Sequence, residues 1–219
     1  MSKTAMTTDD MSIARRTFLL SAGATFATGL LTADLFAQTA EQPSNDMPPF
    51  ARRGLPGPFH AALKPLEGDW RVDKRIFTAV GTRERPAIGV GITCHRRWFG
   101  GGRHLEDITE GTIGGSPYYR LGVLGFSNVD RRYELATFDA LNANMMVYVS
   151  DPLDQPSAKA TLSGTFRDQG LLGEAYAGKL IPMRMTIEIQ GPDRHVVDLT
   201  FMPPGEPEVL IDHSVYARA

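Results

Sequence analysis

The stretch RRWFGGGRHLEDITEG, from Arg96 to Gly111, decides how the chain is expected to fold. A phosphate-binding loop would need Gly-x-x-x-x-Gly-Lys-Ser/Thr ahead of a helix, and a dinucleotide-binding turn would also lead into a helix. Neither pattern is present, and the residues after the glycines are strand-like. Glycine supplies the positive φ angles of a tight turn, so the stretch predicts a β-hairpin.

A three-residue glycine turn sets the expected pairing across this hairpin. The expected pairs are Phe99 with Arg103, Trp98 with His104, Arg96 with Glu106, His95 with Asp107 and Arg97 with Leu105. Each face then carries a pair of opposite charges, which stabilises neighbouring strands. A loop of different length would shift every pair. The face with Arg96 and Glu106 either points inside, as a ligand anchor, or points to water, where its charges contribute little.

The remaining chain after Gly68 continues in short segments rich in Val, Ile, Thr, Tyr and Phe, separated by turn clusters such as Gly114–Pro117 and Gly191–Asp193. About ten strands joined by hairpin-length loops are expected. Such strands must protect their edges, so we predict an all-β fold: an antiparallel, up-and-down, lipocalin-like barrel with a short N-terminal helix at His60–Leu66. A β-sandwich is the alternative.

The N-terminal segment has the plan of an export signal. Arg15 and Arg16 precede a mildly apolar run that carries no charge until Asp34, and cleavage fits best after Ala37. The paired arginines resemble a twin-arginine signal, which would make the export machinery a partner and place the mature protein in the periplasm or outside the cell. The run is too short and too weakly apolar for a stable membrane span, although an uncleaved anchor stays an alternative.

Three regions are therefore expected: a signal peptide at residues 1–37, a Pro-rich linker at 38–58 that should be extended, and a barrel domain at 59–219. Cys94 is the only cysteine, so no disulfide can form within the chain, and we expect it to be a small buried residue. Net charge is -2 and the basic residues are scattered, which argues against a nucleic-acid partner.

Several segments, taken in order, resemble a known family. HAALKPLEGDW resembles the opening of calycin-type barrels, and RRWFGGGRHLEDITEG, GVLGFSNVDRRYELATFDA and the terminal VYAR follow it. Together they resemble bacterial domain-of-unknown-function family 1579 over residues 59–218, although Phe138 stands where that family often has tryptophan. The resemblance implies a lipocalin-like barrel and no established activity. His213 invites comparison with the histidine of more distant nitrobindin-like haem barrels, but a likeness of fold alone is a weak warrant, and we predict no cofactor.

The predicted function is binding of a small, mostly apolar or amphipathic ligand in the barrel lumen. The predicted ligand-binding residues are Arg96, Trp98, His104, Glu106 and Arg120. No nucleophile elbow and no metal-ligand spacing is present, so we predict neither catalytic residues nor a metal site. Two alternatives remain: an enzyme of hydrolase or isomerase type using an acid–base pair such as His104 and Glu106, and an envelope protein with a filled barrel.

Overall fold

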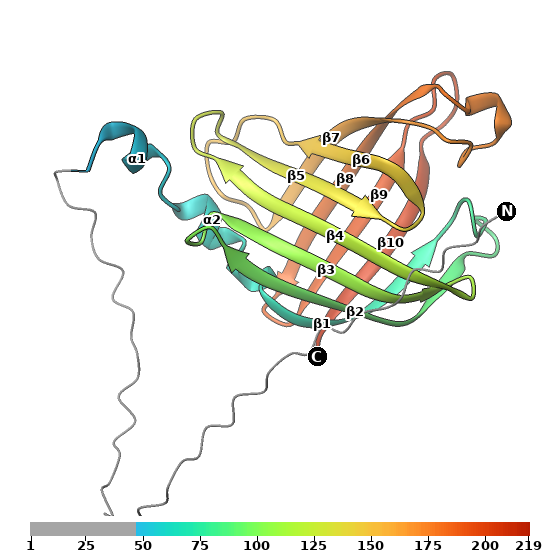
Figure 1. Cartoon of the computed structure of the whole chain (residues 1–219), viewed down its shortest axis with the longest axis horizontal. Helices are drawn as coiled ribbons and strands as arrows, with labels where there is room; N and C mark the ends of the chain where they lie inside the picture. Colours follow the sequence, from blue (N-terminus) through green and yellow to red (C-terminus); the bar gives the residue numbers. More distant parts are fainter. Residues whose placement is uncertain (1–46) are drawn as a thin grey trace, which may run out of the picture. The chain divides into compact units, whose positions relative to one another are not determined.

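The computed structural model describes residues 47–219, in which ten strands close into one antiparallel β-barrel (Figure 1). Each strand pairs with its neighbours in the chain, and the first pairs with the last. The predicted barrel is confirmed, and the sandwich is wrong. The strands are β1 Gly68–Ile76, β2 Ala87–Phe99, β3 His104–Ile113, β4 Ser116–Ser127, β5 Arg132–Asp139, β6 Asn142–Val149, β7 Lys159–Arg167, β8 Leu180–Gly191, β9 Arg194–Phe201 and β10 Val209–Arg218.

Side chains along each strand point alternately into the lumen and to the outer wall. In β1, every second residue from Trp70 to Ile76 is buried, and the residues between them are exposed. The inward side chains of the ten strands form one hydrophobic core with Trp70, Tyr148, Leu162 and Met183 fully buried. Cys94 also belongs to this core, as expected.

The glycine-rich hairpin forms between β2 and β3, but its expected register is wrong by one residue. Phe99 pairs with His104, which leaves a four-residue turn, and Arg96 therefore lies opposite Asp107 rather than Glu106. All three glycines have φ between 61° and 82°, a region that other residues rarely adopt. Arg103 completes the turn, because its guanidinium donates a hydrogen bond to the Gly100 carbonyl at 2.8 Å.

One end of the barrel is covered by the segment that precedes β1 (Figure 1). The expected helix is two short pieces, α2 (Pro58–Ala62) and the 3₁₀ turn η1 (Lys64–Leu66). Leu66 is 1% exposed, and its carbonyl accepts a hydrogen bond from the Trp70 indole at 3.0 Å. Because this contact joins η1 to the first strand, the segment forms a plug at that end.

The plug is preceded by α1 (Pro49–Arg53), which lies in the described part of the expected linker. Arg103 from the glycine turn donates to the Gly54 carbonyl at 2.6 Å, and Asn128 donates to the carbonyls of Arg53 and Leu55. This part of the linker is therefore helical and attached rather than extended. The expected signal peptide and the rest of the linker lie outside the described residues. No helix in residues 47–219 is long and apolar enough to cross a membrane.

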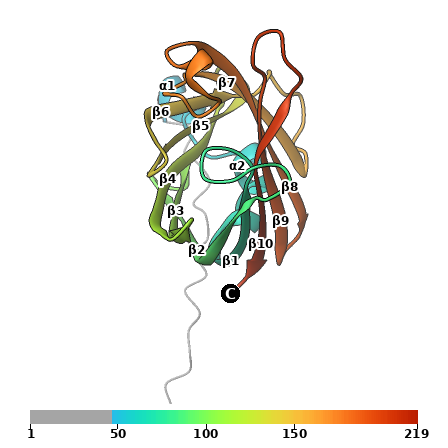
Figure 2. The same ribbon diagram turned by 90° about the vertical axis from the view of Figure 1, so that its right-hand side faces the viewer.

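The ring is weakest between β6 and β7, which share only two residue pairs, Tyr148 with Gly164 and Val149 with Ser163. Beyond these pairs side chains bridge the two segments: Asn144 donates to the Arg167 carbonyl and Gln169 to the Leu141 carbonyl. The loop after β7, with the 3₁₀ turn η2 (Glu174–Tyr176), packs over this end of the barrel (Figure 2). The end away from the plug is thus closed by a loop and a short seam.

Candidate functional site

A cluster of three charged side chains lies inside the barrel. Asp107 on β3 accepts a hydrogen bond from Arg96 Nε on β2 at 2.6 Å, and one from Arg120 Nη2 on β4 at 3.2 Å. All three residues are less than 10% exposed. Removing charges from water costs several kcal/mol each, on the order of the stability of a domain, so buried ions need close partners. Two guanidiniums share one carboxylate here, so the cluster has one positive charge in excess.

Neighbouring polar groups hold this cluster in place. The Thr109 hydroxyl donates to Asp107 at 2.8 Å, and the Cys94 thiol lies 3.4 Å from the same carboxylate. His195 Nε2 lies 2.5 Å from Arg96 Nη1, and the His195 ring stacks on Tyr216 with centroids 4.3 Å apart. Because a guanidinium can only donate, His195 Nε2 must be unprotonated and accept a hydrogen bond from Arg96 Nη1. The cluster is therefore fixed in position from several strands.

The pKa values follow from burial and from these neighbours. Burial alone would favour protonated Asp107, but Arg120 and Arg96 outweigh it and hold its pKa well below the ordinary value. Burial and then Arg96 lower the pKa of His195 to about 2, so its imidazole is neutral at pH 7. Burial raises the pKa of Cys94 to about 11 and that of Tyr216 to about 12. The site consequently has fixed charges near neutral pH and no activated thiol.

A cavity of about 30 Å³ adjoins the cluster. Its charged and polar wall includes Arg96, Asp107, Arg120 and Thr137, and the rest is aliphatic: Leu66, Leu105, Leu124, Leu135, Met185, Ile187 and Val197. The volume is enough for about two or three water molecules, since one water needs roughly 10–15 Å³. Arg120 Nε is buried here without a hydrogen-bond partner among the described residues.

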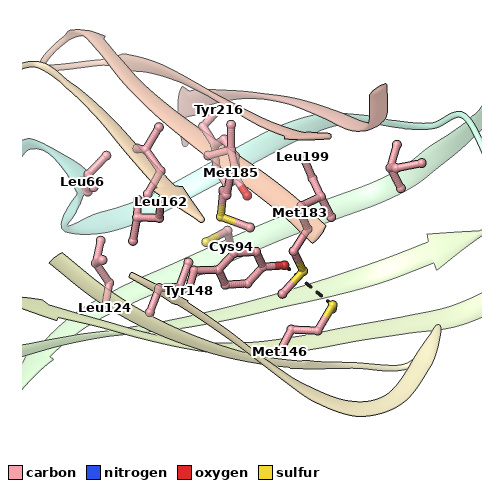
Figure 3. Packing of buried hydrophobic residues seen from close by; sticks show 14 of the residues in the cluster. Leu66, Cys94, Leu124, Met146, Tyr148, Leu162, Met183, Met185, Leu199 and Tyr216 are labelled. Atoms are coloured by element: carbon pink, nitrogen blue, oxygen red, sulfur yellow. Dashed lines mark hydrogen bonds between the residues drawn. The ribbon is translucent and has the colours of Figure 1, made fainter. Parts of the chain in front are cut away.

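A second cavity, of about 50 Å³, lies toward the end covered by the β7–β8 loop and is lined in part by Tyr118, Met146 and Leu199. Near it, Lys74 on β1 pairs with Asp212 and hydrogen-bonds to Ser214. Figure 3 shows Tyr148 between residues of the two cavities, with Leu124 on one side and Met146 on the other. The lumen thus holds two small cavities separated by side chains such as Tyr148 rather than one open pocket.

The structure places the five predicted ligand-binding residues in three different environments. Arg96 and Arg120 meet in the lumen through Asp107. Trp98 is half-buried near the plug, beside a surface groove that also contains Pro56 and His60. His104 and Glu106 lie on the outer wall, because the buried residues of β3 alternate with them. The expected pocket of Trp98, His104 and Glu106 is therefore wrong, because these three side chains do not line one cavity.

Sequence reasoning missed Asp107, His195, Tyr216 and Lys74, although the strand alternation contained a signal for three of them. Asp107 shares a face with Leu105 and Thr109, and His195 shares one with Val197, Leu199 and Phe201. Lys74 falls between Val72 and Ile76 on the inner face of β1. Tyr216 was harder to place, because the register of β10 against β9 shifts between Leu210 and Asp212. His213, compared above with a haem ligand, lies 2.6 Å from the Asp198 carboxylate and outside the lumen.

The fold and site define a class: a closed ten-stranded β-barrel with a plugged end and a buried, charged lumen. The family model described as "Protein of unknown function (DUF1579)" matches residues 55–218, and the chain belongs to that family. No curated protein matches the chain. A solved structure described as EF1p2_mFAP2b bound to DFHBI is similar at a TM-score of 0.36 and 13% identity, over 74% of this chain and 99% of that one. A likeness at this level carries no argument about function.

Proposed function

We propose that the protein binds a small, mostly apolar ligand in the lumen, with its polar end at Arg96 and Arg120. One observation carries this proposal: the charged cluster, with an unpartnered Arg120 N–H, forms one wall of a cavity that is otherwise aliphatic. An apolar pocket with a few fixed polar groups is the usual form of a small-molecule site. Replacing such a cluster by apolar residues is often neutral or stabilising, so a role in binding accounts for its presence better than stability does.

The ligand must displace side chains, because pockets for small molecules have volumes of roughly 300 Å³ or more, and the two cavities measure about 30 and 50 Å³. Methionines supply this freedom, since Met146, Met183 and Met185 are unbranched and lie next to Tyr148 in the centre of the lumen (Figure 3). The seam between β6 and β7 has two residue pairs, so separating these strands requires the least free energy of any part of the wall. We propose this seam as the route of entry.

A thermal-shift series with linear carboxylates of six to twelve carbons tests the proposal, using two neighbouring substitutions. Leu124→Phe fills the cavity, whereas Val123→Phe adds the same ring to the outer wall, where Val123 lines a surface groove. At least one carboxylate should raise the melting temperature of the wild type and of Val123→Phe. The same carboxylate should leave the melting temperature of Leu124→Phe unchanged. The proposal is wrong if no member of the series stabilises the wild type.

A filled barrel with a structural or partner-binding role is the second candidate. The observation in its favour is the small size of both cavities, about 30 and about 50 Å³. The same thermal-shift series separates the two candidates, because a filled barrel would respond to none of the carboxylates.

We also propose that the protein works in the periplasm or outside the cell, after export by the twin-arginine machinery and signal cleavage. Support comes from Arg15-Arg16 and the uncharged run that follows. Mass spectrometry of the protein from the periplasmic fraction should give a chain that begins after Ala37 or Ala40. Lysine at both positions 15 and 16 should leave the full-length chain in the cytoplasm, and export of this variant at the normal level would refute the proposal.

A further inference from the structure

The charges of the lumen restrict which ligand it can accept. Arg96 and Arg120 bring two positive charges, and Asp107 brings one negative charge. His195 is neutral, because it accepts a hydrogen bond from Arg96 and because burial lowers its pKa. One positive charge is therefore left without a close partner in a region removed from water.

The two other carboxylates that face this part of the lumen are already engaged. Asp139 lies across from Arg120 in the β4–β5 register, but its Oδ1 accepts hydrogen bonds from the amides of Leu141 and Asn142 at 2.8 and 3.0 Å. Asp139 makes no ion pair among the described residues, and Asp212 is paired with Lys74. Neither carboxylate accepts a hydrogen bond from Arg120, so both act on it only from a distance.

The unpaired charge is directed at the cavity through a specific atom. Arg120 uses Nη2 for both of its hydrogen bonds, to Asp107 at 3.2 Å and to the Tyr216 hydroxyl at 3.3 Å. Its Nε remains buried without a partner among residues 47–219, and Arg120 lines the cavity beside Leu124, Leu135 and Met185. A guanidinium edge is well suited to the planar oxygens of a carboxylate.

We propose that the lumen ligand is an aliphatic monocarboxylate, whose head group accepts hydrogen bonds from Arg120 and whose tail lies among the leucines and methionines. This inference rests on the proposed function and adds the sign and the number of the charges that the ligand carries. A cationic head group placed beside Arg120 would meet a charge of the same sign. A dianion would bring two negative charges to an arginine that has one positive charge.

Three probes with the same eight-carbon chain, octanoate, 1-octanol and octylamine, test the inference by calorimetric titration. Octanoate should bind on the order of tenfold tighter than octanol, because a hydrogen bond between charged groups adds roughly that factor. Octylamine should bind more weakly than octanol. Arg120→Met should remove the preference for octanoate while the protein stays folded, since Arg96 and Asp107 remain as a neutral pair.

Arg184→Met is the matched control, because Arg184 lies on the outer wall of β8, where it pairs with Glu208. This variant should keep the preference for octanoate. Equal affinity of the wild type for octanoate and octanol, or unchanged octanoate affinity in Arg120→Met, would overturn the monocarboxylate inference while leaving lumen binding intact. Binding of none of the three probes would instead overturn the proposed function itself.

Discussion

Replacing Asp107 by asparagine removes the one carboxylate within residues 47–219 that directly contacts both buried guanidiniums, and it leaves the size of the side chain nearly unchanged. The structure gives Asp107 partners at 2.6 Å (Arg96 Nε), 2.8 Å (Thr109 Oγ1) and 3.2 Å (Arg120 Nη2), all of them buried. Removing one partner of a buried ion pair costs about 3–5 kcal/mol, because the remaining charge stays out of water. Two positive charges would remain here, so we expect the upper part of this range.

Urea unfolding followed by circular dichroism measures the loss. With a slope of about 2 kcal/mol per molar urea, the midpoint should fall by roughly 2 M. A triple variant with methionine at positions 96 and 120 and leucine at 107 should recover most of the loss, because an apolar replacement leaves no unpaired charge. A decrease of less than about 1 kcal/mol in Asp107→Asn would show that water reaches these charges and would refute the buried cluster.

Three further predictions concern the surroundings of the site. His195 has a folded-state pKa of about 2, against 6.5 for the free side chain, so the unfolded chain takes up the proton first as pH falls. The stabilisation of the folded state by neutral His195 is therefore complete above pH 6.5 and decreases below it, by about 2 kcal/mol at pH 5. Urea unfolding of His195→Gln above pH 6.5 and at pH 5 should not show this decrease in the free energy of unfolding. Asn144→Ala should speed hydrogen exchange in β6 and β7 near the seam, and equal exchange in both proteins would argue against the side-chain bridge. Gly101→Val should lower the melting temperature by several degrees, because φ is 68° at this position, and an unchanged melting temperature would contradict the strain argument.

The fold followed from the sequence because strand alternation and turn residues are local signals. Ten segments with short loops and no amphipathic helix left few ways to protect strand edges, and a barrel is one of them. The number of turn residues between Phe99 and His104 could not be predicted from the local sequence in the same way. Three glycines permit loops of three or four residues, and the fourth position is taken by Arg103, whose side chain bonds back to Gly100.

That single residue decided which side chains meet in the site. With the turn one residue longer than expected, Asp107 replaced Glu106 as the partner of Arg96, and Glu106 moved to the outer wall. Arg96 and Arg120 could be proposed as interior residues because each interrupts an otherwise apolar pattern. Their meeting with His195 and Tyr216 depends on closure of the whole ring, which joins β2 to β9 and β10 through β1. No pattern within one strand contains that information.

Native mass spectrometry of the protein purified from its own cells shows directly whether the lumen holds a small acid. We expect a complex heavier than the processed chain by the mass of one small acid, which is released on denaturation and found as a monocarboxylate in negative-ion mode. The complex should be lost in Arg120→Met and retained in Arg184→Met. A wild-type chain that carries no bound molecule, and gains none when octanoate is added, would contradict ligand binding in the lumen and leave the barrel as a filled structural domain.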